Sequence, residues 1–205
     1  LVVVNDTRVV PARLKVRRES GGAVEVLLLE QVEDDRWEAL ARPARRLRPG
    51  ERLGPVELVE PLGDGRWSVR LDGEPEGEAP LPPYIHEPLR DPARYQTVYA
   101  RDAGSAAAPT AGLHLTPELL ARLGTAGARD VAGESLEEHE LHGERYAVSE
   151  QAWARIAEAE RVLAVGTTTV RVLETVAGGG PLAGRTSLFV TPGFAFRRVD
   201  ALLTN

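Results

Sequence analysis

Alternating apolar and polar residues dominate the chain from about residue 12 to residue 80. Short runs of this kind, separated by turns rich in Asp, Gly and Pro, predict antiparallel strands rather than helices. The Gly21-Gly22 pair joins the first two runs in the manner of a hairpin. We expect strands over residues 13–18, 23–30, 37–41, 56–59 and 66–71. Strands at this spacing predict a small barrel or sandwich.

Outside this region the pattern changes to apolar runs that alternate with helix signals. Residues 1–5 and 162–165 are apolar enough for buried strands, and each run ends on polar residues of the capping type. Thr116 before Pro117 predicts the start of a helix, and Ser149 predicts another. We expect helices over residues 117–123, 150–160 and 170–177, and a further strand over residues 187–190.

The two patterns together predict a mixed fold of the α/β class with more than one domain. Residues 162–177, a strand followed by a turn and a helix, form the repeating unit of such folds. We expect an α/β catalytic domain that is discontinuous in sequence and built from residues 1–10 and 81–205. A small β-barrel domain, residues 11–80, is expected as an insertion into it.

Composition narrows the class of protein. With 205 residues, 42% of them hydrophobic, the chain can bury one large or two small cores. The absence of Cys excludes disulfides, thiolate catalysis and a thiolate zinc site. The net charge of −6 argues against a generally basic nucleic-acid binder but leaves room for a local basic face. We see no apolar run of membrane length and no signal peptide, so we expect a cytoplasmic protein without membrane partners.

Residues 81–116 form the most informative candidate surface. The segment is rich in Gly, Ala, Pro and Tyr but poor in the aliphatic residues that build a core. It carries Tyr95, Gln96 and Tyr99, followed by Pro109, Thr110, Ala111 and Gly112. His114 comes next, beside a helix start where the helix dipole favours a neutral imidazole. A lone His is more often structural than catalytic, so both roles stay open for His114.

Asn5-Asp6-Thr7-Arg8 follows the first predicted strand, at the edge where ligands bind in open α/β sheets. Asp6 could act as a base or bind ribose hydroxyls, and Arg8 could bind a carboxylate or a phosphate. The alternative is that Asp6 or Thr7 caps a short helix. The residue types fit both interpretations equally well.

Gly166-Thr167-Thr168 follows the second predicted strand and precedes a helix that carries Arg171. Free backbone N–H groups and hydroxyls in such a turn suit an anion or a ribose. The sequence is not a Walker motif, because no Gly-Lys-Ser/Thr is present. Ordinary helix capping is the alternative, since residues of this type open most helices.

His139 and His142 lie three residues apart among acidic residues. A metal site is conceivable, but the spacing is not that of His-Glu-x-x-His and no third ligand is evident, so we assign no metal. An exposed charged segment is one interpretation. A role in proton transfer or substrate orientation for one of the two histidines is another.

Basic residues occur in two groups within the predicted barrel. Residues 13, 15 and 17 alternate onto one face of a strand. A second group follows near residue 45, and the two groups together could contact a phosphate backbone. A solvated strand face is the alternative. The candidate nucleic-acid-binding residues are Arg13, Lys15, Arg17, Arg42, Arg45 and Arg46.

Five collinear blocks resemble one enzyme family over nearly the whole chain. The blocks are VVVNDTRVVPARL, RYQTVYA…GSAAAPTAGLHLTPELL, EEHELHGERY, VLAVGTTTVRVLE and LFVTPGFAFRRVDALLTN. Together they resemble the S-adenosylmethionine:tRNA ribosyltransferase-isomerases of queuosine biosynthesis. The resemblance implies a mixed α/β domain with an inserted β-barrel, which matches the division expected from the pattern.

The resemblance also implies a reaction. The ribosyl part of S-adenosylmethionine would be transferred to the aminomethyl group of a deazaguanine at the tRNA wobble position and rearranged, giving epoxyqueuosine and releasing adenine and methionine. S-adenosylmethionine is then a co-substrate, tRNA is the partner, and no metal or other cofactor is needed; we expect a monomer. His114 or Asp6 would be the base, and His139 or His142 the other proton carrier.

The remaining candidates would bind substrates. Tyr95, Gln96 and Tyr99 would stack on or bond the exposed base or adenine. Arg8 and Arg171 would hold the methionine carboxylate or a tRNA phosphate. The residues expected to line the nucleotide pocket, beside Asn5 and Thr7, are Pro109, Thr110, Ala111, Gly112, Gly166, Thr167 and Thr168.

Two alternatives stay open, an S-adenosylmethionine-dependent RNA methyltransferase and a non-catalytic RNA-binding module. The sequence also departs from the family. Members of the family carry a Gly- and Thr-rich stretch before the Glu-His-Glu block, whereas here residues 129–133 run directly into Glu134. We therefore expect a missing segment near Asp130 to Gly133. We likewise expect the protein to continue before Leu1 and after Asn205.

Overall fold

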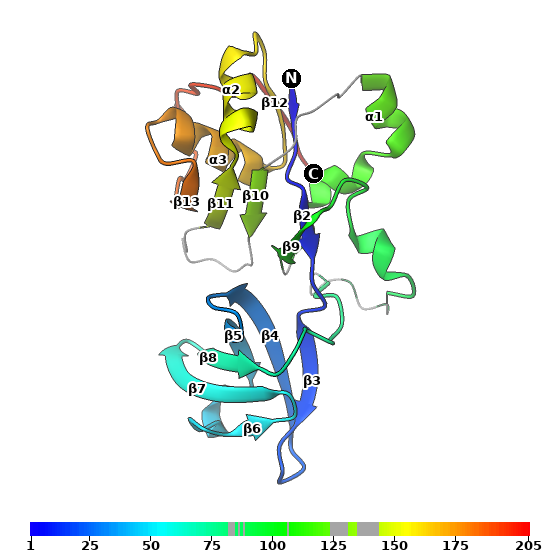
Figure 1. Ribbon diagram of the computed structural model, residues 1–205, viewed down its shortest axis with the longest axis vertical. Helices are drawn as coiled ribbons and strands as arrows, with labels where there is room; N and C mark the ends of the chain where they lie inside the picture. Colours follow the sequence, from blue (N-terminus) through cyan, green and yellow to red (C-terminus); the bar gives the residue numbers. More distant parts are fainter. Residues whose placement is uncertain (82–84, 86, 88, 106, 124–130, 135–143) are drawn as a thin grey trace. The chain divides into compact units, whose positions relative to one another are not determined.

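The computed structural model describes residues 1–81, 85, 87, 89–105, 107–123, 131–134 and 144–205. The chain forms two compact units (Figure 1). The α/β unit contains Leu1–Arg8, Ala93–Ala103 and Ala108–Asn205, and the barrel unit contains Val9–Pro92 and Gly104–Ala107. Two short strands that pair with each other, β2 (Thr7–Val9) and β9 (Asp102–Ser105), each contain one of the points where the chain passes from one unit to the other. The predicted domain boundaries, 1–10 with 81–205 and 11–80, stay a prediction.

The barrel unit is one antiparallel sheet with the strand order β3-β4-β5-β8-β7-β6. Figure 1 shows these strands curling around one another into a nearly closed barrel. The strands are β3 (Arg13–Arg17), β4 (Ala23–Gln31), β5 (Arg36–Arg42), β6 (Arg52–Leu53), β7 (Val56–Gly63) and β8 (Arg66–Leu71). The expected mixed α/β fold with a small β-barrel is therefore confirmed.

The barrel core is built from the alternation that predicted its strands. Val24, Val26 and Leu28 of β4 are buried, while the residues between them are partly exposed. Trp37 of β5 and Trp67 of β8 are also buried. One face of each strand therefore fills the barrel and the other faces solvent, as in antiparallel sheets with one solvated side. Lys15, Arg17 and Arg42 lie on this solvated face, whereas Arg45, Arg46 and Arg48 lie between β5 and β6.

The α/β unit contains two three-stranded sheets. One is parallel, with the order β1-β12-β14, and the other is antiparallel, with the order β10-β11-β13. The strands are β1 (Val2–Val3), β10 (Val131–Glu134), β11 (Glu144–Val148), β12 (Leu163–Val165), β13 (Ala183–Thr186) and β14 (Ala201–Leu203). The helices are α1 (Pro117–Leu123), α2 (Glu150–Glu158) and α3 (Thr167–Ala177).

Short polar signals fix the starts of two helices. The Leu119 amide donates to the Thr116 hydroxyl at 3.2 Å, and the Ala152 amide donates to the Ser149 hydroxyl at 3.1 Å. Each bond satisfies a backbone donor that has no partner within the helix. Both predicted helix starts are confirmed. The helix expected over residues 170–177 begins earlier, at Thr167, directly after the Gly166 turn.

The strand expected over residues 187–190 is wrong. The strand lies four residues earlier, as β13, where Ala183–Thr186 pairs with β11. The chain leaves the sheet at Thr186, whose hydroxyl accepts a bond from the Leu188 amide at 3.2 Å. The pairing with β11 decides the position, and pairing between segments distant in the chain leaves no local pattern in the sequence.

A buried carboxylate links α3 to the end of the chain. Glu174 is 3% exposed and accepts backbone hydrogen bonds from Arg197 at 2.8 Å, Arg198 at 2.9 Å and Val199 at 2.8 Å. The Val162 amide donates to Asp200 at 2.8 Å. These bonds hold the segment that leads into β14. Among the described residues, no helix is both long enough and apolar enough to cross a membrane.

Candidate active site

The parallel sheet brings three chain segments to one edge. The carboxyl end of β1 leads into Asn5 and Asp6, that of β12 into Gly166, and that of β14 towards Asn205. The Gly166 amide donates to the Leu203 carbonyl at 2.8 Å, which ties two of these ends together. Ligands of α/β proteins bind outside the carboxyl ends of parallel strands. The two polar segments predicted from opposite ends of the sequence therefore share one candidate site.

A local turn fixes the backbone on either side of Asp6. Oδ1 of Asn5 accepts a hydrogen bond from the Thr7 amide at 2.9 Å and another from the Thr7 hydroxyl. Both side chains are buried. The chain continues directly into β2, so the alternative that Asp6 or Thr7 caps a short helix is wrong. Asn5 and Thr7 form an Asx-type turn that orients Asp6.

Asp6 is a carboxylate with only 1% of its side chain exposed. Arg101 donates to it from Nε at 3.2 Å and from Nη2 at 2.7 Å, and both bonds end on Oδ2. The other oxygen, Oδ1, is buried and has no hydrogen-bond partner among the described residues. A buried charge is costly unless it is paired. Arg101 therefore stabilises the carboxylate while leaving one oxygen available.

Tyr99 belongs to the same polar cluster, which we define as Asp6, Thr97, Tyr99 and Arg101. Burial, and then the negative charge of Asp6, raise the pKa of Tyr99 to about 12, and the neighbouring Thr97 hydroxyl opposes the shift. Tyr99 is therefore protonated at neutral pH and can donate a hydrogen bond. Within the described part of the chain, neither hydroxyl has a hydrogen-bond partner of good geometry. Buried polar atoms of this kind call for a ligand or an ordered water.

The backbone of Gly112 lies directly against this cluster. A methyl group on Gly112 would overlap the Tyr99 hydroxyl and lie 2.9 Å from Cγ2 of Thr97. Only Gly allows the loop to approach the tyrosine so closely. Gly112, Thr97 and Tyr99 thus pack together within the segment 81–116, and Arg101 of the same segment bonds to Asp6 after β1. Pro109 and Thr110 are half-buried at its start, and Ala111 is buried beside Gly112.

His114 lies at the end of the short turn η3 (Thr110–His114), with its imidazole exposed. Its Nε2 atom lies 3.2 Å from Oδ1 of Asn205. Ala111 and Leu115 anchor the turn, because they pack against the ends of β1 and β12. His114 is thus held at the carboxyl edge of the parallel sheet, and its functional role stays a prediction.

The start of α3 supplies backbone donors to the edge. Gly166 has a φ of 94° and precedes the helix without a side-chain cap. Thr167 is exposed and Thr168 is half-buried, whereas the Thr169 hydroxyl bonds back to the Val165 carbonyl at 2.8 Å. Thr169 therefore stabilises the helix start. The N–H groups of Thr167 and Thr168 and their hydroxyls are placed to bind a polar ligand.

Arg171 makes internal contacts. Its Nη1 atom lies 2.6 Å from Glu144 Oε1, and its Nε atom donates to the Leu188 carbonyl at 2.7 Å. Both side chains of the ion pair are largely buried. This pair joins α3 to β11, which favours a structural role for Arg171. The proposed contact of Arg171 with a carboxylate or phosphate stays a prediction.

The other predicted substrate residues differ in their exposure to solvent. Arg8 is exposed on β2, Tyr95 is buried in η2 (Pro92–Tyr95), and Gln96 is half-buried. Of these, only Arg8 presents its side chain fully to solvent. His139 and His142 lie outside the described residues. Within the described ranges no group of His, Cys, Asp and Glu could hold a metal ion.

Two members of the edge were missed from the sequence. Arg101 pairs with a residue 95 positions away, and Asn205 contacts one 91 positions away. Nothing in the local pattern marks either of them. The only available signal was that Arg101 lies two residues after the Tyr-Gln-Thr-x-Tyr cluster, which ends at Tyr99.

The predicted nucleic-acid-binding residues of the barrel unit fall into two groups. Lys15 pairs with Glu78 at 2.7 Å, Arg17 donates to the Gly21 carbonyl at 3.1 Å, and Arg13 lies 3.4 Å from the Leu81 carbonyl. Arg42, Arg45 and Arg46 are exposed. The three residues of β3 thus have local acceptors, whereas the second group is open to solvent.

Comparison with known proteins identifies the class. The family described as Queuosine biosynthesis protein matches residues 1–205, and the chain belongs to this family. Curated relatives carry the name S-adenosylmethionine:tRNA ribosyltransferase-isomerase. The relative from Rubrobacter xylanophilus is 48% identical, and the match covers 100% of this chain and 68% of that protein. The relative from Symbiobacterium thermophilum is 45% identical, and the match covers 100% of this chain and 71% of that protein. The family expected from the five sequence blocks is confirmed, and these names favour the transferase-isomerase over both alternatives.

A solved structure also matches. The S-adenosylmethionine tRNA ribosyltransferase from Thermotoga maritima is 30% identical, with a TM-score of 0.40 over 98% of this chain and 64% of that chain. The chain thus spans less than two thirds of that protein. The aligned regions of the curated relatives are 229 and 241 residues long, so they carry residues that this chain lacks. Val131–Glu134 is continuous as β10, and the rest of the expected break lies outside the described residues.

Proposed function

We propose that this chain transfers and isomerises the ribosyl moiety of S-adenosylmethionine onto the aminomethyl-deazaguanine at the wobble position of tRNA. The products are epoxyqueuosine in tRNA, adenine and methionine. Family membership supports the reaction class. The observation that carries the assignment of the site is the buried Asp6 carboxylate, with one paired and one free oxygen, at the carboxyl edge of a parallel sheet.

Asp6 is proposed as the base. The reaction requires removal of a proton from the carbon next to the sulfonium, where the positive charge increases the acidity. Oδ1 of Asp6 accepts that proton, because Arg101 occupies Oδ2 and Oδ1 has no partner among the described residues. The pair with Arg101 also holds the carboxylate in one orientation, as effective proton transfer requires.

Tyr99 and Thr97 are proposed to bind the ribosyl hydroxyls. Tyr99 is a donor at neutral pH because burial raises its pKa to about 12. Substrate hydroxyls can accept from Tyr99 and bond to Thr97, which satisfies two buried hydroxyls and leaves Asp6 Oδ1 to act as the base. Gly112 lies against Tyr99, and its N–H donates to the Pro109 carbonyl, so the backbone donors proposed for the substrate are those at the start of α3.

His114 is proposed to assist the departure of adenine. The imidazole is exposed and held by Asn205, so it can present a proton to a leaving nucleobase at this edge. His139 and His142 stay alternatives for this second proton carrier. Arg8 is the exposed cation proposed for the methionine carboxylate, since Arg171 already pairs with Glu144.

One assay separates the three candidate activities. The full chain is incubated with S-adenosylmethionine and an anticodon stem-loop carrying the aminomethyl-deazaguanine, and the products are measured by mass spectrometry. Release of adenine and methionine with a mass increase in the RNA supports the proposal. S-adenosylhomocysteine would indicate a methyltransferase, and RNA binding without turnover would indicate a binding module. The location in the cytoplasm, the monomeric state and the lack of a metal requirement stay predictions.

A further inference from the structure

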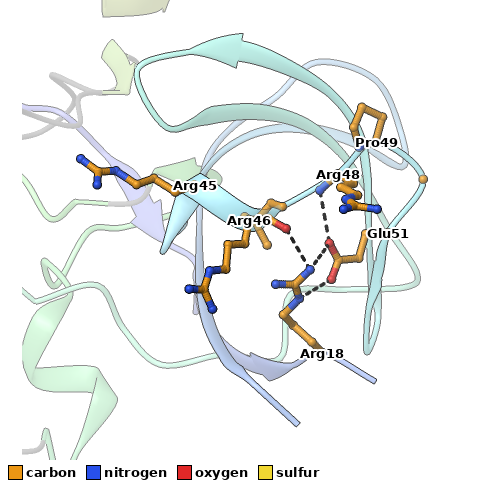
Figure 2. A pocket seen from close by; sticks show the side chains of 8 residues that line it. Arg18, Arg45, Arg46, Arg48, Pro49 and Glu51 are labelled. Atoms are coloured by element: carbon orange, nitrogen blue, oxygen red, sulfur yellow. Dashed lines mark hydrogen bonds and ion pairs between the residues drawn. The ribbon is translucent and has the colours of Figure 1, made fainter. Parts of the chain in front are cut away.

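The barrel unit carries a solvent-open hollow of about 630 Å³ (Figure 2). We call it the arginine hollow. It is lined by Arg18, Arg45, Arg46, Leu47, Arg48, Pro49, Gly50 and Glu51. Four arginines and one carboxylate therefore line a single concavity. It belongs to a different unit from the candidate active site.

An ion pair forms the base of the hollow. Arg18 donates from Nε to Glu51 Oε1 at 2.6 Å and from Nη2 to Oε2 at 3.0 Å. The same Nη2 atom donates to the Arg46 carbonyl at 2.9 Å, and Glu51 accepts from the Arg48 amide at 3.2 Å. A bidentate pair of this kind fixes geometry as well as charge. The Arg18–Glu51 pair thus clamps the backbone on both sides of Leu47.

The clamp neutralises only one of the four cations. Arg45, Arg46 and Arg48 are exposed, and none of the three side chains has an interaction partner among the described residues. Leu47 between them is 9% exposed and anchors the segment in the barrel. Three guanidinium groups without a counter-charge are therefore exposed on a segment that Leu47 and the Arg18–Glu51 pair hold in place.

The three side chains point in different directions. Figure 2 shows Arg45 extending away from the Arg18–Glu51 pair, Arg46 running beside Arg18, and Arg48 on the far side near Glu51. A single small anion would be met by only part of this set. A chain of phosphates could contact all three arginines in succession, because each guanidinium presents donors that match a phosphate.

We propose that the arginine hollow binds successive phosphates of an RNA backbone, with the Arg18–Glu51 pair as the positioning element. The inference rests on the proposed function, which supplies a tRNA as the substrate. It also answers a problem of charge, since a chain with net charge −6 needs a local basic surface to hold RNA. The hollow replaces β3 as the main contact, because Lys15 there is already paired with Glu78.

The first test removes the three exposed cations. The R45A/R46A/R48A variant of the full chain is compared with R122A/R155A/R161A, which removes the same charge from exposed positions of the α/β unit. Binding of a labelled anticodon stem-loop is measured from 50 to 300 mM salt. We expect the hollow variant to lose about 10- to 100-fold in affinity and about two to three units of salt slope, and the control variant to lose far less.

The second test addresses the clamp. The R18A/E51A variant keeps the net charge and the three exposed arginines, and we expect it to bind the RNA about 3- to 10-fold more weakly because their backbone is no longer held. The exchanged variant R18E/E51R restores an ion pair but neither backbone bond, because a carboxylate at position 18 cannot donate to the Arg46 carbonyl and a guanidinium at position 51 cannot accept from the Arg48 amide. It should therefore bind as weakly as R18A/E51A, and recovery of the affinity would show that the backbone bonds do not matter. Circular dichroism checks that each variant is folded. Normal binding by R18A/E51A would overturn the positioning role.

The outcomes separate the hollow from the proposed function. If the wild-type chain binds RNA and both triple variants weaken it equally, net charge is responsible and the hollow is rejected. If the hollow variant binds as tightly as the wild type, the hollow is also rejected while the proposed function stands. If the wild-type chain binds no RNA, both fall. A selective loss in the hollow variant supports the inference, and release of adenine at saturating RNA should then be unchanged.

Discussion

The polar cluster of the α/β unit and the arginine hollow of the barrel unit use charge in opposite ways. In the cluster a single carboxylate is almost completely buried and is held by one Arg, and it lies beside hydroxyls that have no hydrogen-bond partner of good geometry in the described part of the chain. In the hollow three cations are exposed, and the only carboxylate is used to fix the backbone.

The difference follows from the electrostatics of burial. A charge removed from water interacts strongly with its neighbours and is screened little by salt, so it can direct a reaction at one atom. Exposed charges interact weakly one by one, but several of them attract a polyanion and respond to ionic strength. The cluster is therefore suited to chemistry and the hollow to binding, and each should fail in its own way when altered.

The largest expected effect is on the cluster. D6N keeps the shape of Asp6 but removes the negative charge and the basic oxygen. We expect release of adenine in a single turnover to fall about 1,000-fold, the range expected for loss of a positioned general base. Rapid-quench measurements at saturating RNA provide the rate. The stem-loop should bind D6N with normal affinity.

The matched control for D6N is D200N, since Asp200 is a second carboxylate of the α/β unit that bonds to a backbone amide and lies outside the cluster. It should lose stability rather than catalytic rate. A D6N protein that releases adenine at the wild-type rate would exclude Asp6 as the base and leave His114 as the remaining described candidate.

The next largest effect is on the free energy of unfolding of the α/β unit and concerns Glu174. The two oxygens of the buried Glu174 carboxylate accept from three backbone N–H groups. E174Q replaces one of these acceptor oxygens by an NH₂ group, which cannot accept. We expect a loss of about 2–3 kcal/mol, because at least one buried donor loses its partner. Calorimetry should show a lower melting temperature for the α/β unit.

E158Q, an exposed residue of α2, is the control for E174Q because it changes the net charge equally. Its unfolding should match that of the wild type. Because Glu174 and the arginine hollow lie in different units, E174Q should not weaken binding of RNA by the barrel unit. Equal melting temperatures for E174Q and E158Q would contradict the role of Glu174 in holding the segment that leads into β14.

A smaller effect is expected at Gly112. In G112A the added methyl group displaces the Tyr99 hydroxyl, and we expect the rate to fall about 10- to 30-fold through misplacement of that donor. Y99F removes the atom that the methyl group overlaps. The double variant G112A/Y99F should therefore lose less than the sum of the two single changes. Strict additivity would show that the contact between Gly112 and Tyr99 does not matter for the site.

The sequence anticipated the elements that depend on local pattern. The strands of the barrel follow from alternation, and α1 follows from Thr116 and Pro117, because these signals act over a few residues. The strands β10, β11 and β13 are short, and their positions depend on one another through pairing across the chain. No local signal could place them, and the strand predicted over residues 187–190 was displaced for this reason.

The candidate site shows the same limit. Asp6, Gly112, His114 and Gly166 were predicted because each lies in a segment whose composition is unusual. Their partners were not predicted, since Arg101 is an ordinary residue until the fold brings it to Asp6. Arg171 was predicted because it follows the Gly166 turn closely. The fold pairs its side chain with Glu144, and its contact with a ligand stays a prediction.

The smallest expected effect is that of salt on the single-turnover rate. It tests directly whether the cluster and the hollow have separate roles. Raising the salt concentration from 50 to 200 mM should weaken RNA binding about 20- to 40-fold if three arginines contact phosphates, because bound counterions are released with each contact. Over the same range the single-turnover rate at saturating RNA should change less than about 2-fold, because a buried ion pair such as Asp6–Arg101 is screened little. Both quantities can be measured on one preparation by titration and rapid quench. A rate that falls in parallel with affinity would mean that exposed charge also governs the chemical step, and the separation of roles between the two regions would then be wrong.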